Sequence, residues 1–217
     1  MIKILYSDAH MVVCLKPTGV LSQDGGESSM PQLLAKQLQV QQVYAVHRLD
    51  KAVGGVMVYA LNEKAAAAFG RAVQDRTMEK TYFAVLRGVP QQAQGDLEDL
   101  LFHDKTKNKT YVVDRVRKGV KDAKLSYKTL QSVDGRSLVS VRLYTGRTHQ
   151  IRVQFASRKL PLVGDGRYGG KEPGVELGLW SCGLTLRHPV TGKELRFFHK
   201  PPQEEPWNQF EMYELCD

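Results

Sequence analysis

The sequence consists largely of short apolar runs that turn-forming residues interrupt, a pattern typical of a strand-rich fold. The runs at 2–6 and 11–16 are separated by Ser-Asp-Ala-His and predict a hairpin. A second hairpin is predicted around Asp-Gly-Arg at 134–136, and a third within 180–201, where Thr191–Gly192 forms the turn. Further strands are predicted at 55–61 and 80–88.

Helix signals are fewer. Leucines spaced for one face predict a helix over 31–39, with Pro31 in its first turn. Alanine-rich 62–75 predicts a second helix capped by Asn62. The polar segment 89–123 predicts a loop or a strand pair that carries basic residues outward. The fold class expected is therefore α+β, with helices flanking a large mixed or mostly antiparallel sheet.

The composition is that of an ordinary globular protein, and 217 residues are enough to bury a sizeable core. We expect a single catalytic domain over 1–217. The sequence shows no long apolar run and no signal-peptide pattern, and its three distant cysteines argue against disulfides and a zinc site. We therefore expect a cytoplasmic protein without membrane contact. The formal net charge of +8 points to a polyanionic partner.

An unusual charged group lies within the apolar segment 44–61. His47, Arg48, Asp50 and Lys51 are crowded together just before a predicted strand. A solvated turn with a surface salt bridge would explain them. A carboxylate kept ionised for chemistry would explain them equally well.

A second polar group lies at 144–157, where five polar residues follow a predicted turn: Arg147, Thr148, His149, Gln150 and Arg152. If 147–157 is a helix, His149 and Arg152 share a face. The polar end of such a helix suits phosphate, whereas the alternative is a merely charged helix end.

Five motifs together resemble the pseudouridine synthases of the RluA family. They are "KPTGVL" (16–21), "HRLD" (47–50), "KTYFAVLRG" (80–88), "GRTHQIRV" (146–153) and "LVGDGRYG" (162–169). The resemblance extends from Ile4 to about Pro202. It implies the pseudouridine synthase catalytic fold with a central basic cleft, RNA as partner, and no cofactor or metal. Since the chain begins directly at this region, no N-terminal S4 domain is expected.

The resemblance also implies roles for individual residues. Asp50 is the catalytic group, either as nucleophile at C1′ or by stabilising cationic character there and helping to remove a ribose proton. Tyr82 packs on the uracil and is placed near its C5 atom. Arg152 pairs with Asp50 and keeps it charged. Arg48 enters the base stack when the target uridine flips out. Further candidate substrate-binding residues are His47, Arg147, His149, Gln150 and Leu162.

Each of these residues also has a structural interpretation. Tyr82 and Leu162 could simply fill the core, and Arg152 could form a surface ion pair. His47 and His149 could be satisfied turn histidines. Lys16 is interpreted as a solvated loop lysine.

The chain departs from the family pattern at three positions. Relatives usually follow "HRLD" with a Thr-Ser-Gly step, whereas Val53 and Gly54 precede Gly55 here, and Gln154 replaces a histidine. These changes bear on the choice of RNA or on the detail of the pocket. The motif "GDGRYG" (164–169) also fits G-x-G-x-x-G, but no helix follows it, so no nucleotide cofactor is expected. Its glycines instead indicate sharp turns, with Asp165 and Tyr168 bracing the fold.

The predicted function is conversion of uridine to pseudouridine at specific sites in ribosomal or transfer RNA, by a monomer. A non-catalytic RNA-binding protein on the same scaffold is the main alternative, although it would not need Asp50. A hydrolytic glycosidase is a second alternative, but it would typically use two opposed carboxylates, and only one acid lies among the key motifs.

Overall fold

The computed structural model describes residues 1–26 and 28–211, which form two compact units. The first unit contains residues 1–81 and 180–199, and the second contains the segments from Tyr82 to Leu179 and from Lys200 onward. Strand β5 (Glu79–Arg87) begins in the first unit and continues into the second. The single catalytic domain over 1–217 stays a prediction. None of the described helices is both long and apolar enough to cross a membrane.

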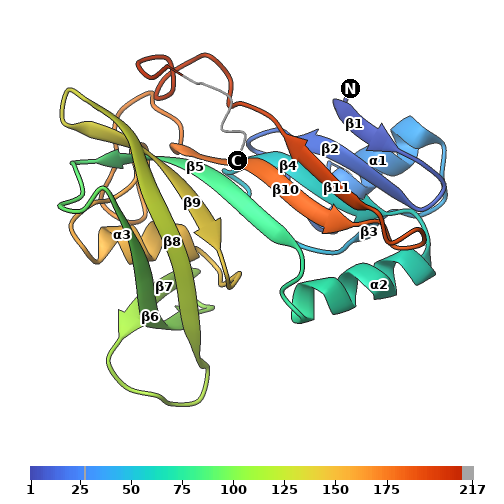
Figure 1. Ribbon diagram of the computed structural model, residues 1–217, viewed down its shortest axis with the longest axis horizontal. Helices are drawn as coiled ribbons and strands as arrows, with labels where there is room; N and C mark the ends of the chain where they lie inside the picture. Colours follow the sequence, from blue (N-terminus) through green and yellow to red (C-terminus); the bar gives the residue numbers. More distant parts are fainter. Residues whose placement is uncertain (27, 212–217) are drawn as a thin grey trace. The chain divides into compact units, whose positions relative to one another are not determined.

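A mixed sheet forms the framework of the first unit, with the strand order β1-β2-β4-β10 (Figure 1). Strand β2 pairs antiparallel with β1 and β4, while β10 runs parallel to β4 and antiparallel to β11, and β3 lies beside β4. The elements are β1 (Ile4–Ser7), β2 (Met11–Lys16), α1 (Met30–Leu38), β3 (Tyr44–Ala45), β4 (Gly54–Ala60), α2 (Glu63–Gln74), β10 (Leu179–Arg187) and β11 (Glu194–Phe198).

The core of this unit follows the two-residue period of its strands. Alternate residues of β2, β4 and β10 point to one side, where Ala65 and Phe69 of α2 join them in one buried cluster. The predicted cap of α2 is confirmed, because the Asn62 side chain accepts the Ala65 N–H at 2.9 Å. Both predicted hairpins of this unit, β1–β2 and β10–β11, are also confirmed.

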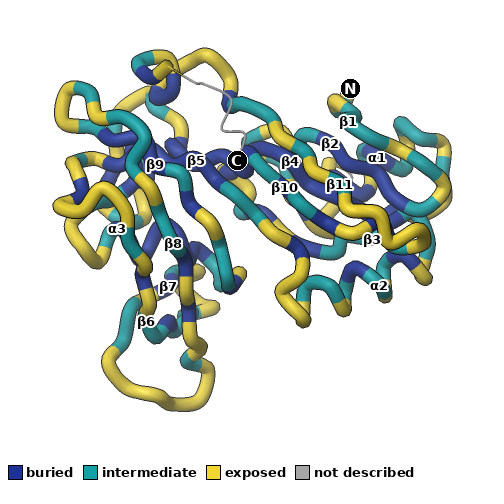
Figure 2. The backbone as a smooth tube through the Cα atoms, viewed as in Figure 1, coloured by how far each residue is buried: buried dark blue, intermediate teal, exposed yellow. Residues whose placement is uncertain are grey.

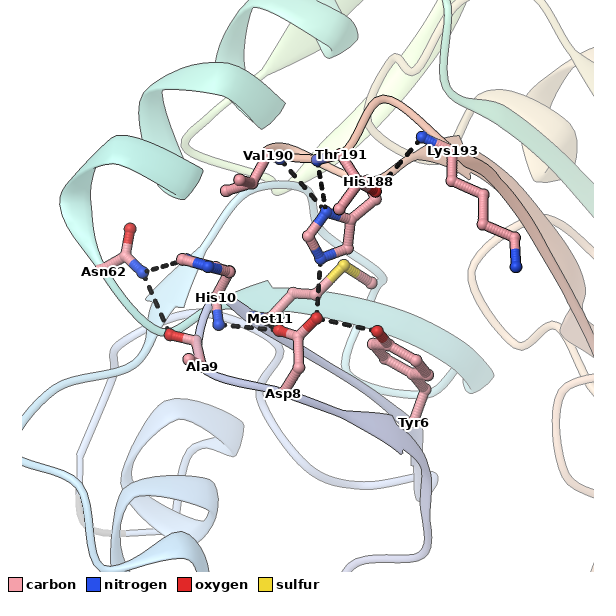
Figure 3. Close-up of polar contacts among 10 residues, drawn as sticks. All are labelled: Tyr6, Asp8, Ala9, His10, Met11, Asn62, His188, Val190, Thr191 and Lys193. Carbon is pink, nitrogen blue, oxygen red and sulfur yellow. Dashed lines mark hydrogen bonds and ion pairs between the residues drawn. The ribbon is translucent and has the colours of Figure 1, made fainter.

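A partly buried polar cluster joins the β1–β2 turn to the end of β10 (Figure 3). One Asp8 carboxylate oxygen contacts His188 Nε2 at 2.7 Å, and the other accepts the N–H groups of His10 and Met11. Tyr6 donates its hydroxyl to Asp8, and the His188 ring accepts two backbone N–H groups on Nδ1. Since Nδ1 is an acceptor, Nε2 carries the proton that is donated to Asp8.

Antiparallel strands form the second unit in the order β9-β8-β6-β7, with α3 packed against β6 and β7 (Figure 1). The elements are β6 (Gln94–Asp104), β7 (Lys109–Val113), β8 (Val120–Val133), β9 (Arg136–Leu143) and α3 (Gln150–Ala156). Val153 of α3 packs on Leu101 and Ala123 of the strands. The predicted β8–β9 hairpin is confirmed, with φ of 47° at Asp134 and 73° at Gly135, the signature of a type I′ turn.

The polar segment 89–123 contains the strand pair β6–β7. Its turn residues Lys105 and Lys107 are exposed, as is the β7–β8 loop at 114–119 (Figure 2). The α+β class and the mixed, mostly antiparallel pairing are thus confirmed. The third helix is shorter than predicted, because α3 begins only at Gln150, after His149 at a φ of 54°.

Candidate active site

The "HRLD" motif forms an extended segment that leads into β4. His47 and Leu49 point inward, with 8% and 6% of their surface exposed, whereas Arg48 is exposed and Asp50 is half-buried. The Val53 N–H donates to the Asp50 carbonyl at 2.9 Å, so Asp50 opens a tight turn just before the strand. The backbone therefore directs Arg48 toward solvent, holds His47 and Leu49 in the core, and leaves Asp50 half-buried.

Lys16 binds a backbone carbonyl of this turn from inside the protein. Its interpretation as a solvated loop lysine is therefore wrong. Its side chain is fully buried, because β2 carries it inside and main-chain oxygens surround its Nζ. Nζ donates to the carbonyls of Pro17, Val20 and Lys51 at 2.8, 2.7 and 3.2 Å. Burial lowers the pKa of Lys16 to about 8, although the charge of Asp50 acts in the opposite direction. Lys16 thus joins the 17–20 loop to the turn that carries Asp50.

Ser22, two residues beyond this loop, makes a second connection to the motif. Its hydroxyl donates to the Leu49 carbonyl at 2.8 Å and accepts the Leu49 N–H at 3.1 Å. The Tyr59 hydroxyl of β4 donates to the Ser22 carbonyl. The residue before Asp50 is therefore fixed through both of its backbone polar groups.

His47 lies where a structural histidine would lie. Its Nε2 accepts the Val58 N–H at 3.2 Å, and its buried Nδ1 has no hydrogen-bond partner among the described residues. Burial lowers the pKa of His47 to about 3, with a further contribution from the charge of Lys80, so the ring is neutral. This location supports the structural interpretation, while the predicted contact with substrate is untested.

Trp180 accounts for the unusual Gly54. A Cβ atom at Gly54 would lie 2.4 Å from Cζ3 of the Trp180 ring. The ring cannot easily move, because its Nε1 donates to the His199 carbonyl at 2.9 Å. Where the family pattern has serine, this chain therefore has an indole ring in the space that the side chain would take.

Arg152 lies in α3 of the second unit and is 8% exposed. Its Nε and Nη2 donate to the two oxygens of Asp165 at 2.7 and 2.8 Å, a bidentate ion pair. Its guanidinium also lies 5.2 Å from the centre of the Tyr168 ring. The surface ion pair considered for Arg152 is wrong, because the pair is buried. The predicted partnership with Asp50 stays a prediction.

The residues before Arg152 build the turn that starts α3. The Gln150 side chain accepts from Thr145 Oγ1 and the Arg147 N–H, and it donates to the Lys124 carbonyl. Arg147 Nε donates to the Asp122 carbonyl at 2.8 Å. His149 Nδ1 lies 3.0 Å from the Tyr168 hydroxyl. All three predicted substrate contacts, Arg147, His149 and Gln150, thus have structural partners, and contact with RNA is untested.

Two further candidates are apolar or aromatic and buried. Leu162 is completely buried beside β5, where it forms a bridge with Leu86. Tyr82 in β5 is 5% exposed. Gln154, the third departure from the family pattern, is also completely buried and donates to the Leu97 carbonyl and to Asp99. The predicted contact of Tyr82 with uracil and that of Leu162 with substrate stay predictions.

The structure brings the site residues together within each unit: His47, Arg48 and Asp50 in the first, and Arg147, His149, Gln150, Arg152 and Leu162 in the second, which also contains Tyr82. Sequence reasoning missed Lys16 and Ser22 as supports of the Asp50 turn, although the "KPTGVL" motif marked the position of Lys16. It named Asp165 only as a brace. Among the described residues, no three His, Cys, Asp or Glu side chains are grouped to hold a metal ion.

Comparison with known proteins identifies the family. A model of the family described as RNA pseudouridylate synthase matches residues 10–157. The chain belongs to this family. A "Dual-specificity RNA pseudouridine synthase RluA" of Salmonella typhi is 32% identical over 200 residues, covering 89% of this chain and 90% of that protein. A "tRNA pseudouridine synthase C" of Yersinia pestis is 31% identical, covering 95% and 88%.

A solved structure agrees with these relatives. "Human RNA Pseudouridylate Synthase Domain Containing 4" matches with a TM-score of 0.77 and 26% identity, covering 93% of this chain and 89% of that one. The resemblance to the RluA family and the pseudouridine synthase fold are therefore confirmed. This chain is an RNA pseudouridine synthase, an isomerase that acts on uridine in RNA.

Proposed function

We propose that this pseudouridine synthase modifies particular uridines of structured ribosomal or transfer RNA, with Asp50 as its catalytic group. The observation that carries the proposal is the Asp50 turn. Asp50 is half-buried, and Lys16 and Ser22 fix the backbone on both sides of it. A carboxylate without a function would not require a buried lysine that fixes the backbone next to it.

The reaction breaks the N1–C1′ bond, turns the uracil, and forms a C5–C1′ bond. C5 then loses its proton, and N1 gains one. Asp50 acts at the ribose, as nucleophile at C1′ or by helping to remove a ribose proton while it stabilises positive charge there. Tyr82 is the proposed neighbour of C5, and Arg152 the proposed partner of Asp50.

The target uridine must leave the base stack before it can react, at a cost of a few kcal/mol. Arg48 is proposed to occupy the space that the base vacates. Its exposed position next to buried Leu49 supports this role, since the side chain is available to RNA while its backbone is fixed.

The choice of RNA is inferred from two relatives. One carries "dual-specificity" and the other "tRNA" in its name. We infer that a transfer RNA, a ribosomal RNA or both serve as substrate in a central basic cleft. The net charge of +8 supports this proposal, and it predicts that binding weakens steeply with salt because phosphate contacts release counterions. A cytoplasmic location and a monomeric state stay predictions, which fluorescence imaging and sedimentation can check.

The experiment measures tritium release from C5-labelled uridine in unmodified transfer and ribosomal RNA transcripts. Wild type is compared with Asp50→Asn and with Asp75→Asn, a matched change of an exposed carboxylate at the end of α2. We expect release by wild type and Asp75→Asn, and none by Asp50→Asn, which still binds the transcript. Full turnover by Asp50→Asn would refute the role of Asp50. Binding without release by wild type would favour the non-catalytic alternative.

A further inference from the structure

The GDGRYG loop, residues 164–169, is the motif that the reaction does not explain. We propose that this loop holds Arg152 in its working position, with Asp165 and Tyr168 as positioning residues, and that Tyr168 connects Arg152 to the β6–β7 hairpin. This inference rests on the proposed function, in which Arg152 takes part in catalysis.

Asp165 is the main support of the arginine. It is 1% exposed, and its two oxygens engage Nε and Nη2 along one edge of the guanidinium. Two bonds in one plane fix both the position and the rotation of this group. Asp165 therefore orients the guanidinium before any substrate arrives.

The loop in turn fixes the carboxylate. Asp165 Oδ1 also accepts the N–H groups of Arg167 and Tyr168, at 3.1 and 3.3 Å. The Asp165 carbonyl accepts the Gly170 N–H at 2.9 Å. Gly164 permits this tight path, because it has a φ of 74° and a Cβ there would lie 2.1 Å from the Glu176 carbonyl oxygen. Gly164 of the motif thus serves the placement of a carboxylate.

Tyr168 supports the other side of the guanidinium. Its ring faces the Arg152 cation, and its hydroxyl accepts the Thr110 N–H of β7 at 2.8 Å. The same hydroxyl can donate to His149 Nδ1, 3.0 Å away. The aromatic ring is therefore anchored at its polar end to a strand and to the residue that precedes α3.

The β6–β7 hairpin is bound to this assembly by further contacts. Thr110 Oγ1 donates to the Thr148 carbonyl at 2.8 Å, and Arg167 Nη1 donates to the Lys107 carbonyl at 3.0 Å. Lys109 Nζ lies 5.5 Å from the centre of the Tyr168 ring. Movement of the hairpin would therefore be transmitted to Tyr168, and from its ring to Arg152.

The test is a double-mutant cycle on tritium release at saturating and at limiting RNA. Asp165→Asn keeps the shape of the side chain but loses the charge. We expect it to lower kcat by about 10- to 100-fold, with KM changed less than about threefold, because a misplaced catalytic group costs turnover rather than binding. In an Arg152→Ala background the same change should cost less than about twofold.

The matched control is Asp99→Asn. Asp99 forms a two-bond pair with Arg158, just beyond the end of α3, and also accepts from Gln154. Its replacement therefore removes a two-bond ion pair of the same unit that is more exposed than the Arg152–Asp165 pair. We expect Asp99→Asn to leave kcat within about twofold of wild type. A loss of kcat equal to that of Asp165→Asn would mean that either change simply weakens the unit, and would overturn the proposal.

Tyr168→Phe keeps the inference testable if Asp165→Asn does not fold. It retains the ring beneath Arg152 and removes the hydroxyl that binds β7. We expect kcat to fall about 3- to 10-fold in wild type and to stay unchanged in the Arg152→Ala background. Equal losses in both backgrounds would refute the positioning role. If Arg152→Ala alone left turnover intact, the proposed function of Arg152 would fail instead, a result that the single variant distinguishes.

Discussion

The turn that carries Asp50 and the helix that carries Arg152 are held by different kinds of contact. Lys16 and Ser22 hold the Asp50 turn through backbone atoms of Leu49 and Lys51. Arg152 is held directly, through its own guanidinium, by a carboxylate and an aromatic ring. The first set of contacts fixes the backbone on both sides of Asp50, whereas the second fixes the charged group of Arg152 itself.

The difference has a chemical reason. A short aspartate is placed well once its backbone is placed, because it has only two side-chain torsions. An arginine has a long, flexible side chain, so fixing its backbone leaves the guanidinium free to move over several ångströms. The support must therefore act at the guanidinium. Changing the contacts of Asp50 and of Arg152 in turn tests this difference.

The largest effect is expected from Arg152→Lys. Lysine keeps the positive charge but loses the planar fork that engages both oxygens of Asp165. We expect turnover of labelled RNA to fall about 100-fold, with stability changed by about 1–2 kcal/mol. Arg158→Lys, the same change at the Asp99 pair, should retain turnover. Near-normal turnover by Arg152→Lys would show that a point charge is enough and that orientation of the fork does not matter.

The second prediction concerns Lys16→Met. Methionine fills a similar volume but removes the Nζ donor from the carbonyls of Pro17, Val20 and Lys51, of which the last also accepts the Gly19 N–H. We therefore expect a loss of about 2–4 kcal/mol in the free energy of unfolding, together with reduced turnover. Chemical denaturation measures the former. Lys64→Met, at an exposed position of α2, serves as the control.

The effect of Lys16→Met should also depend on pH. The pKa of Lys16 is about 8 in the folded protein, against 10.5 for an ordinary lysine. Between these values the unfolded chain binds more protons, so the wild type gains stability as pH rises. The variant lacks this gain, and its deficit should therefore grow from pH 8 to 10. A deficit that is constant with pH would contradict the burial of a charged Lys16.

The third prediction concerns Gly54→Ser, which restores the residue expected from the family pattern. The new side chain meets the Trp180 ring, so we expect destabilisation of about 2 kcal/mol. Trp180→Leu in the same chain should recover at least half of that loss, which thermal unfolding of the double-mutant cycle can measure. Additive losses would show that Trp180 does not account for the glycine.

Local patterns predicted most of the secondary structure from the sequence. The Asn62 cap, the Asp134–Gly135 turn and the alternating strands all follow from contacts between residues close in sequence. The start of α3 could not be placed this way, because the side chain of Gln150 replaces helical bonds by binding Thr145 and Lys124, and propensity does not report such contacts.

The site residues likewise divide into those that local sequence patterns predict and those whose contacts arise only in the folded chain. The motifs located Asp50, Tyr82 and Arg152, but they could not show which of their neighbours are buried. Lys16 looks like a loop lysine in the sequence, since lysine is rarely buried, and its three acceptors are backbone carbonyls that leave no mark in the sequence. The sequence predicted a structural role for Asp165, whereas its partner Arg152 is known only from the structure.

The smallest effect is expected at Asp8, in the β1–β2 turn, whereas Lys16 is the last residue of β2. This change tests whether the Asp50 turn depends on the whole first unit. Burial alone would raise the pKa of Asp8, but hydrogen bonds from His10, His188, Met11 and Tyr6 lower it to about 2. Because the ordinary value is 3.8, the stabilisation by Asp8 is present above pH 4 and is lost as pH falls toward 2.

Because solvent screens this partly exposed group, we expect wild type to lose about 1 kcal/mol of its free energy of unfolding as the pH falls. Acid denaturation measures this loss, which should be absent from Asp8→Asn. At pH 7, Asp8→Asn should be slightly less stable than wild type and yet turn over RNA normally. If turnover fell as far as it does in Lys16→Met, the support of Asp50 would extend through the whole sheet of the first unit. The loss of turnover in Lys16→Met would then not be due to the local contacts of Lys16 alone.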